Sequence, residues 1–274
     1  MDKSKDRNQK VLVLDIDGTL TNSEKEITKA TRQGIIDIQE RGHIVILASG
    51  RPTPGMKRYA EELELEKYGG YLLSFNGAKI INCKTKEIIF QQTLPSEVIA
   101  GIYHFATEYD CGIITYMDDY IVSGRRIDRY LELESRINNL PMKQVNNFEE
   151  YQKYDINKCL LTADPELAAQ YEKKLQEAFK GVLSIYRSEP FFIEIMPLNI
   201  DKATSLDKML ASVGLTRENA ICCGDGFNDM TMIQYAGLGV AMENAQPAVK
   251  EAADYITKSN DEDGIAHVID KFIL

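Results

Sequence analysis

The chain of 274 residues is predicted to be an α/β protein, a doubly wound parallel sheet with an α+β module inserted into it. The run VLVLD, from Val11 to Asp15, is apolar up to its last residue, as expected of a strand buried on both faces. Strand-like runs alternate with segments of helical periodicity over residues 11–80 and again over residues 201–274. This alternation is typical of parallel βαβ units.

The predicted sheet is built from strands and helices in strict succession. After VLVL comes a helix over residues 27–41, with Ser23 as its candidate N-cap and Gly42 as its end. HIVILAS is the second strand, residues 53–66 form the second helix, and YLLSFNG is the third strand. The C-terminal part continues with helix 201–213, strand NAICCGD, helix 229–235, strand LGVAM, helix 246–253, the run DYIT and a last helix from residue 263.

The middle of the chain, residues 79–195, is richer in tyrosine and has a different pattern. Its strand candidates are AKIIN, EIIFQ, GIITYM, YIVSG, KCLLTA, LSIYRS and FFIEIM. Helices predicted over residues 95–109 and 165–180 divide it into two similar halves, each a helix followed by a pair of strands. We therefore expect an inserted α+β domain over residues 82–192, with an antiparallel sheet, within an α/β core of residues 1–81 and 193–274.

Composition excludes several classes of partner. The net charge of −10 disfavours nucleic acid, because binding a phosphate backbone needs a basic face. The five cysteines are odd in number and form no CxxC pair, which indicates reduced thiols and no zinc site. The first residues are charged, and no apolar run is long enough for a signal peptide or a membrane span. A cytoplasmic protein without a membrane or nucleic-acid partner is expected.

Polar residues gather where the predicted strands end. In a parallel α/β sheet, ligands bind beyond the carboxyl ends of the strands. Four strands bring to that edge Asp15, Asp17, Ser49, Gly50, Arg51, Asn76, Gly77, Asp225, Asn228 and Asp229, and Lys202 opens the helix that follows the module. Such convergence from separate strands is a more specific signal than any one motif.

These residue types suggest phosphoryl transfer. Asp15 and Asp17 would repel each other unless a positive charge lay between them, and carboxylates are ligands that Mg²⁺ prefers. The candidate Mg²⁺ ligands are Asp15, Asp17, Asp225 and Asp229. Asp15 is the candidate nucleophile, which would form an aspartyl-phosphate, and Asp17 is the candidate general acid and base.

Ser49 and Lys202 complete the predicted catalytic set. Ser49 would hold the phosphoryl oxygens, and Lys202 would neutralise the charge that they develop. The candidate substrate-binding residues are Gly50, Arg51, Asn76, Gly77 and Asn228. Asn76-Gly77 fits an ordinary turn equally well, and Arg51 fits a helix cap equally well, so these interpretations stay open.

The motifs DIDGTL, ASGR, the lysine at 202 and GDGFNDM resemble, in the same order, those of the haloacid dehalogenase-like phosphohydrolases. The resemblance is nearest to the Cof-type sugar-phosphate phosphatases and extends to SFNGA and ITKSNDEDGI. It implies a Rossmann-like core, an aspartate nucleophile, one Mg²⁺ ion, a small phosphorylated metabolite as substrate, and a large mobile cap domain inserted after the third strand. One feature departs from the group's pattern: Lys202 stands between Asp201, a candidate helix N-cap, and Ala203, where the group has a small residue and a glycine. Glu194 matches a recurrent acidic position of the group and is assigned no role.

Several other motifs fit ordinary structural roles better. The second DxDG, at residues 261–264, is predicted to cap the last helix. A calcium loop starting at Asp15 is disfavoured because Leu20 occupies the position that needs glycine. The three histidines are scattered. In the module, a solvated turn is preferred over a substrate-facing surface for Tyr116, Asp118, Asp119, Arg125 and Arg126.

The leading function is a Mg²⁺-dependent phosphatase of small phosphomonoesters. A phosphomutase acting on a sugar phosphate is the second possibility, and a binding protein that has lost turnover is the third. The sequence identifies neither the substrate nor the oligomeric state.

Overall fold

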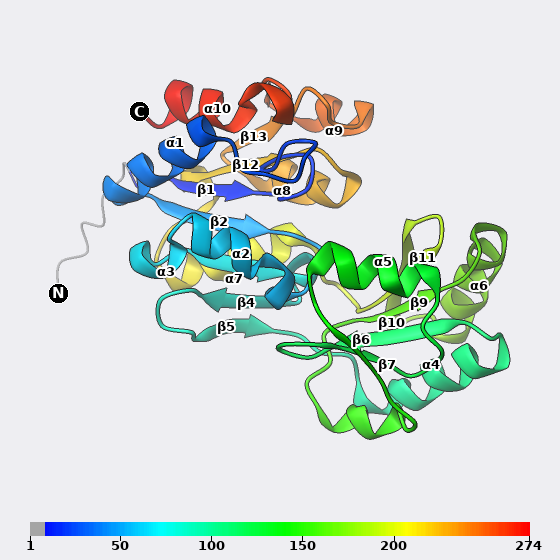
Figure 1. The fold of residues 1–274 in the computed structure, drawn as a ribbon. Coiled ribbons are helices and arrows are strands. Elements are labelled where there is room, and N and C mark those ends of the chain that lie inside the picture. The colour runs from blue at the N-terminus through cyan, green and yellow to red at the C-terminus, as the bar shows by residue number, and fades with distance from the viewer. Residues whose placement is uncertain (1–8) are drawn as a thin grey trace. The chain divides into compact units, whose positions relative to one another are not determined.

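The computed structural model describes residues 9–274, which divide into two compact units (Figure 1). Unit 1 contains the described residues up to Phe90 together with Asp201–Leu274, and unit 2 contains Gln91–Ile200. The chain therefore leaves unit 1 once, builds unit 2, and returns.

Unit 1 is built on an eight-stranded sheet in the order β14-β13-β12-β1-β2-β3-β4-β5. Its parallel strands are β1 (Val11–Leu14), β2 (Ile44–Ala48), β3 (Tyr71–Ser74), β12 (Ala220–Gly224), β13 (Leu238–Ala241) and β14 (Tyr255–Ile256). β4 (Lys79–Asn82) runs antiparallel to β3, and β5 (Ile88–Gln91) closes that edge. Because β1 lies between β12 and β2, the residues after it stand at the centre of the sheet's carboxyl edge.

Helices cover both faces of this sheet, which confirms the predicted doubly wound fold (Figure 1). One face packs against α1 (Lys29–Glu40), α2 (Thr53–Glu62), α9 (Pro247–Ala252) and α10 (Gly264–Phe272), and the other against α7 (Lys202–Ser212). α8 (Met230–Tyr235) contributes to both cores, Ile233 to the first and Met232 to the second. Leu12 and Leu14 belong to the first core, Val11 and Val13 to the second. Because successive side chains of a strand point to opposite faces and both faces are buried here, VLVL has no polar face.

Three local expectations for unit 1 are wrong. The N-cap of α1 is Thr28, whose hydroxyl accepts from the Thr31 N–H, whereas Ser23 donates to Asp261. The runs AKIIN and EIIFQ extend the sheet of unit 1 as β4 and β5, because apolar pairing with β3 continues across the sheet edge. Asp263 precedes α10 in a left-handed conformation and makes no side-chain cap bond.

Unit 2 has a six-stranded sheet in the order β10-β11-β9-β6-β7-β8. The strands are β6 (Gly112–Tyr116), β7 (Ile121–Ser123), β8 (Met142–Gln144), β9 (Cys159–Thr162), β10 (Leu183–Glu189) and β11 (Phe192–Pro197), antiparallel except for the β7–β8 pair. Side chains from α4 (Ser96–Glu108) and α6 (Pro165–Ala178) share its core. α5 (Arg129–Asn138), capped by Asp128, and β8 were not predicted.

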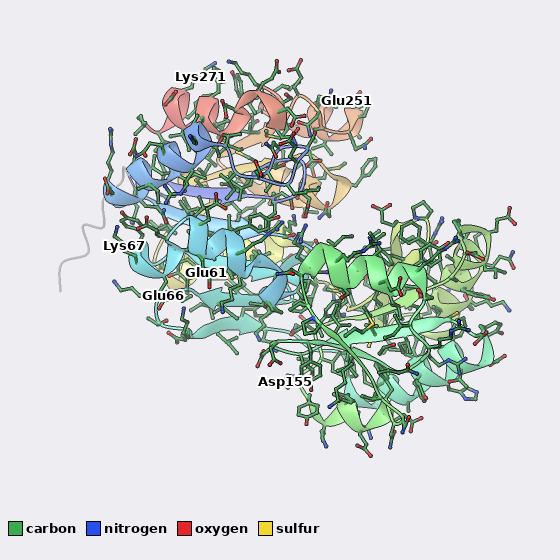
Figure 2. The ribbon with its side chains drawn as sticks, viewed as in Figure 1. Glu61, Glu66, Lys67, Asp155, Glu251 and Lys271 are labelled. Atoms are coloured by element: carbon green, nitrogen blue, oxygen red, sulfur yellow. The ribbon has the colours of Figure 1, made fainter. Side chains whose placement is uncertain are left out.

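Short elements connect the larger ones. They are α3 (Leu65–Tyr68) and the 3₁₀ turns η1 (Phe75–Gly77), η2 (Glu149–Lys153), η3 (Arg217–Asn219), η4 (Phe227–Asp229) and η5 (Asn260–Glu262). Charged side chains such as Glu66, Lys67 and Lys271 point outward from the helices that carry them (Figure 2). The five cysteines are free thiols, and all five are buried. Among the described residues, no helix has the length and apolar character needed to cross a membrane.

Candidate active site

The centre of the candidate site is a buried lysine between two aspartates. Asp15 follows β1, and Lys202 is the first residue of α7, whose N-cap Asp201 accepts from the Thr204 N–H at 2.8 Å. The Lys202 Nζ donates to Asp15 Oδ1 at 2.7 Å, to Asp229 Oδ1 at 2.6 Å and to the Ala48 carbonyl at 2.8 Å. An ammonium has three protons, so these bonds satisfy it completely. Lys202 has no exposed surface.

Burial and charge together set the protonation of this cluster. Burial disfavours the Lys202 ammonium, but the Asp15 and Asp229 carboxylates outweigh it and raise the pKa of Lys202. Burial, followed by the negative charges of Asp229 and Asp225, raises the pKa of Asp15 above its usual range, and Lys202 opposes that rise. The site therefore holds a permanent cation and an excess of negative charge.

Three carboxylates form a group suited to a divalent cation. Oxygens of Asp15, Asp225 and Asp229 lie within 4.8 Å of one another. With all three ionised and Lys202 protonated, the group carries a net charge of −2, the charge that a Mg²⁺ ion would balance. Within the described chain, Oδ2 of Asp15 and Oδ2 of Asp225 accept no hydrogen bond, so each has a ligand atom to offer.

The close approach of Asp225 explains the glycine of the DIDGTL motif. Thr19 Oγ1 donates to Asp225 Oδ1 at 2.8 Å, and Asp229 Oδ2 accepts from the backbone N–H groups of Asp225 and Gly226. Gly18 has φ +84°, and a Cβ there would lie 2.5 Å from Asp225 Oδ2. Burial is the main cause that raises the pKa of Asp225 to about 6, and the charge of Asp229 adds to it. The residues present therefore fit a Mg²⁺ ion.

Asp17 lies outside this three-carboxylate group. Its Oδ2 accepts from Arg51 Nε at 2.7 Å, its Oδ1 from Arg51 Nη2 at 2.8 Å, and Oδ1 also pairs with Lys25 Nζ at 3.0 Å. Although burial acts in the opposite direction, Arg51 and Lys25 lower the pKa of Asp17 to about 2. Arg51 is thus engaged with a carboxylate, and the prediction that Asp17 binds a metal stays a prediction.

The other predicted residues lie along the same edge of unit 1. Ser49 follows β2 and is buried, and its Oγ accepts from the Arg51 N–H at 3.2 Å. Asn228 Nδ2 donates to Asn76 Oδ1 at 3.1 Å, which joins the η4 and η1 turns. A Cβ at Gly50 would lie 3.3 Å from the Asn76 amide, and Gly77 accepts a hydrogen bond from Ser205. The structure therefore brings these positions together without testing their roles.

Sequence reasoning missed three partners of these residues. Thr19, Lys25 and Asn244 contact Asp225, Asp17 and the Gly18 carbonyl, respectively. Thr19 lies inside DIDGTL, so its position in the motif was an available signal. Lys25 and Asn244 lie in segments whose folding back toward the site no local pattern indicates.

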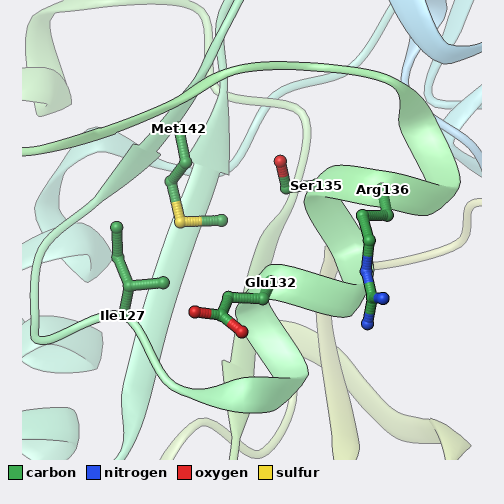
Figure 3. A pocket seen from close by; sticks show the side chains of 5 residues that line it. All are labelled: Ile127, Glu132, Ser135, Arg136 and Met142. Carbon is green, nitrogen blue, oxygen red and sulfur yellow. The ribbon is translucent and has the colours of Figure 1, made fainter.

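A separate pocket lies in unit 2. It has a volume of about 470 Å³ and is lined by Ile127, Glu132, Ser135, Arg136 and Met142 (Figure 3). Glu132, Ser135 and Arg136 come from α5, and none of the lining residues belongs to the predicted catalytic set. The pocket therefore lies apart from the candidate catalytic residues, which gather in unit 1.

Comparison with known proteins identifies the class. Residues 12–269 match the family described as haloacid dehalogenase-like hydrolase, and the chain belongs to that family. The protein is accordingly an enzyme, a phosphatase of the haloacid dehalogenase (HAD) type with a cap domain.

Individual relatives agree with this class. YxeH of Bacillus subtilis, named as a candidate phosphatase, is 30% identical over 97% of this chain and 98% of its own. A solved haloacid dehalogenase-like hydrolase from Bacteroides thetaiotaomicron is 44% identical, with a TM-score of 0.93 over 96% of this chain and 99% of its own. The HAD subclass IIB sugar phosphatase BT4131 is 25% identical, with a TM-score of 0.82 over 97% of this chain and 100% of its own.

Proposed function

We propose that this phosphatase is Mg²⁺-dependent and acts through an aspartyl-phosphate on Asp15. The observation that carries the proposal is the fully buried Lys202 ammonium, bonded to both Asp15 and Asp229 at the carboxyl edge of the sheet. A buried ion pair is weak support for stability, because desolvation offsets its attraction. The same arrangement suits a reaction in which charge develops on a phosphoryl group.

The metal would be held by Asp15 and Asp225, with Asp229 as the third carboxylate of the group. When bound, Mg²⁺ would neutralise charge on the phosphoryl oxygens. Asp17 remains a further candidate ligand, through a change in the pairing that now engages its carboxylate.

Each residue then has a defined part in two successive displacements. A carboxylate oxygen of Asp15 forms a bond to phosphorus while the bond to the leaving oxygen breaks, and Asp17 gives that oxygen its proton. A water then attacks phosphorus, its proton passes to Asp17, and the bond to Asp15 breaks. Lys202 stays charged throughout, and Ser49 and the backbone N–H groups after it hold the phosphoryl oxygens.

Arg51 connects substrate binding to the protonation of Asp17. In the structure, Arg51 holds Asp17 ionised, and an ionised carboxylate cannot act as a general acid. A phosphoryl dianion competes for the same guanidinium, because both anions accept two parallel N–H bonds. Substrate binding would therefore draw Arg51 from Asp17 and allow Asp17 to take up a proton.

The proposed substrate is a sugar phosphate or a related small metabolite. BT4131 is a sugar phosphatase, and the Bacillus subtilis relative YcsE, 30% identical over 97% of this chain, is a 5-amino-6-(5-phospho-D-ribitylamino)uracil phosphatase. We propose that unit 2, which has a hydrophobic core of its own, is the cap that selects the leaving group. Replacing residues 91–200 by the corresponding segment of YcsE should then give this protein the order of substrate preference of YcsE.

The test is phosphate release from a panel of phosphomonoesters, with Mg²⁺ and with EDTA. Asp15→Asn should abolish both release and the phosphorylated protein seen by intact mass, whereas Asp270→Asn, an equal charge change on an exposed residue of α10, should abolish neither. Release that survives in EDTA, or in Asp15→Asn, would refute the mechanism. Transfer of phosphate between positions of a sugar without net release would identify a mutase instead.

A further inference from the structure

Two asparagines beyond the last predicted motif reach back to the loop that carries Asp17. Asn244 Nδ2 donates to the Gly18 carbonyl at 2.8 Å, and Asn260 Nδ2 donates to the Thr21 carbonyl at 2.9 Å. The two are joined, because the Asn260 N–H donates to Asn244 Oδ1 at 3.0 Å. The Asn244–Asn260 pair therefore holds both ends of the segment from Gly18 to Thr21.

The pair is itself fixed to the site. Just before Asn244, the Met242 N–H donates to the Gly224 carbonyl, and just after it the Gln246 N–H donates to the Asp225 carbonyl at 3.0 Å. Asn244 thus moves with the strand end that supplies Asp225. Both ends of its amide are used, the oxygen as acceptor and the nitrogen as donor, and an aspartate of the same shape could not donate.

The held segment is short and tightly turned. Gly18 has φ +84°, Thr19 Oγ1 is bonded to Asp225, and Thr21 bonds back to the Ile16 carbonyl through both its N–H and its hydroxyl. Asp17 is the residue before this segment, and its side chain is about one third exposed. Arg51 and Lys25 hold the Asp17 carboxylate, and the bonds to the Gly18 and Thr21 carbonyls hold the backbone from which that side chain projects.

We propose that Asn244 and Asn260 are positioning residues for the proton transfer by Asp17. The inference rests on the proposed function, in which Asp17 protonates the leaving oxygen. It also gives the SNDEDG segment a role other than capping α10, because Asn260 and Asp261 both bond to residues 21–23.

The positioning role has a signature in the leaving group. An alkyl oxygen must receive a proton as its bond to phosphorus breaks, whereas p-nitrophenolate leaves without one. A general acid displaced by about 1 Å costs on the order of 100-fold in rate. Loss of the pair should therefore slow the cleavage of alkyl phosphates selectively.

The experiment compares Asn244→Asp and Asn260→Asp with the unaltered protein in single turnovers with enzyme in excess. We expect the single-turnover rate constant for glucose 6-phosphate to fall about 10- to 100-fold with little change in the enzyme concentration that gives half the maximal rate. The rate constant for the first release of p-nitrophenolate from its phosphate should stay within about 3-fold. Asp17→Asn should show the same selectivity. Asn219→Asp is the matched control, since the Asn219 amide bonds the Gln9 carbonyl at the opposite end of β12.

If the rate constants for both substrates fall by the same factor, the effect is a general structural one and the proposal is overturned. Unchanged rate constants with both substrates would also overturn it. If the unaltered protein releases no phosphate from either ester, the proposed function fails and the inference fails with it. Circular dichroism of each variant establishes that the rates compare folded proteins.

Discussion

Replacing Asp225 by asparagine is expected to abolish metal-dependent activity and also to stabilise the metal-free protein at neutral pH. Asp225 follows β12 and belongs to the three-carboxylate group with Asp15 and Asp229. Burial, with the charge of Asp229 adding to it, raises its pKa from the ordinary 3.8 to about 6. Without a metal, the ionised form of this side chain is therefore disfavoured in the folded state.

The size of the effect follows from the pKa difference. About two units at 1.36 kcal/mol each give a ceiling of ~3 kcal/mol. The folded carboxyl holds its proton more tightly than the unfolded one, so its contribution to stability is fully present below about pH 4 and is lost as pH rises through about 6. Asparagine carries no charge, and its carbonyl oxygen can still accept from Thr19. Because Asp225 is partly exposed, we expect a gain of about 1–3 kcal/mol at pH 7–8.

The assay is urea unfolding in EDTA over about pH 5 to 8. The stability difference between Asp225→Asn and the unaltered protein should grow with pH and level off above about pH 7. With Mg²⁺ at 100 times its Kd, the unaltered protein should gain about 2.7 kcal/mol and the variant nothing. Asp270→Asn should show neither effect. If Asp225→Asn is no more stable than the unaltered protein in EDTA at high pH, the ionised Asp225 carboxylate does not destabilise the metal-free fold and the reasoning is wrong.

Four further substitutions or conditions test the remaining contacts. Lys202→Met removes the buried cation that Asp15 and Asp229 share. Kinetics should show a loss of activity of at least about 100-fold, and urea unfolding a loss of about 3–5 kcal/mol in the free energy of unfolding. Arg51→Lys should raise KM about tenfold or more, since a lysine cannot form the paired bonds of a guanidinium; an unchanged KM would remove Arg51 from substrate binding. The affinity for Mg²⁺, measured by calorimetry, should weaken up to tenfold for each pH unit below about pH 6, because protonated Asp225 is a poor ligand. Asp201→Ala should cost about 1 kcal/mol in thermal unfolding without changing kcat, because its carboxylate caps α7; a changed kcat would show that Asp201 acts on Lys202.

Local patterns were enough to predict the strands of unit 1 and their alternation with helices. Apolar runs fixed by burial on both faces predicted β1, β2, β3, β12 and β13, and the alternation with helices predicted the doubly wound sheet. The predicted boundary at residue 82 placed β5 in the inserted module, because a strand's sequence does not say which sheet it joins. The local patterns also missed α5, whose buried face carries two polar residues, Glu134 and Asn138, beside Leu131, and they missed β8.

The motif sequences determined which residues stand at the carboxyl edge of the sheet. An aspartate after a buried strand in a parallel sheet must project beyond its carboxyl end, so Asp15 and Asp225 could be placed from sequence alone. Lys202 could be proposed from its place after the insertion. Such reasoning locates each residue relative to the end of a strand or helix, because the short-range pattern of apolar residues sets where those elements lie in the sequence.

The pairing of those residues was decided by the tertiary structure. Lys202 meets Asp15 from 187 positions away, Asn244 meets Gly18 from 226 positions away, and Asp17 bonds Arg51 in preference to joining the other carboxylates. Hydrogen bonds and ion pairs depend on distances of a few ångströms between side chains, and those distances exist only once the helices have packed on the sheet. The sequence alone therefore determined the class of fold and the candidate residues at the edge of the sheet, and packing decided which charges face one another.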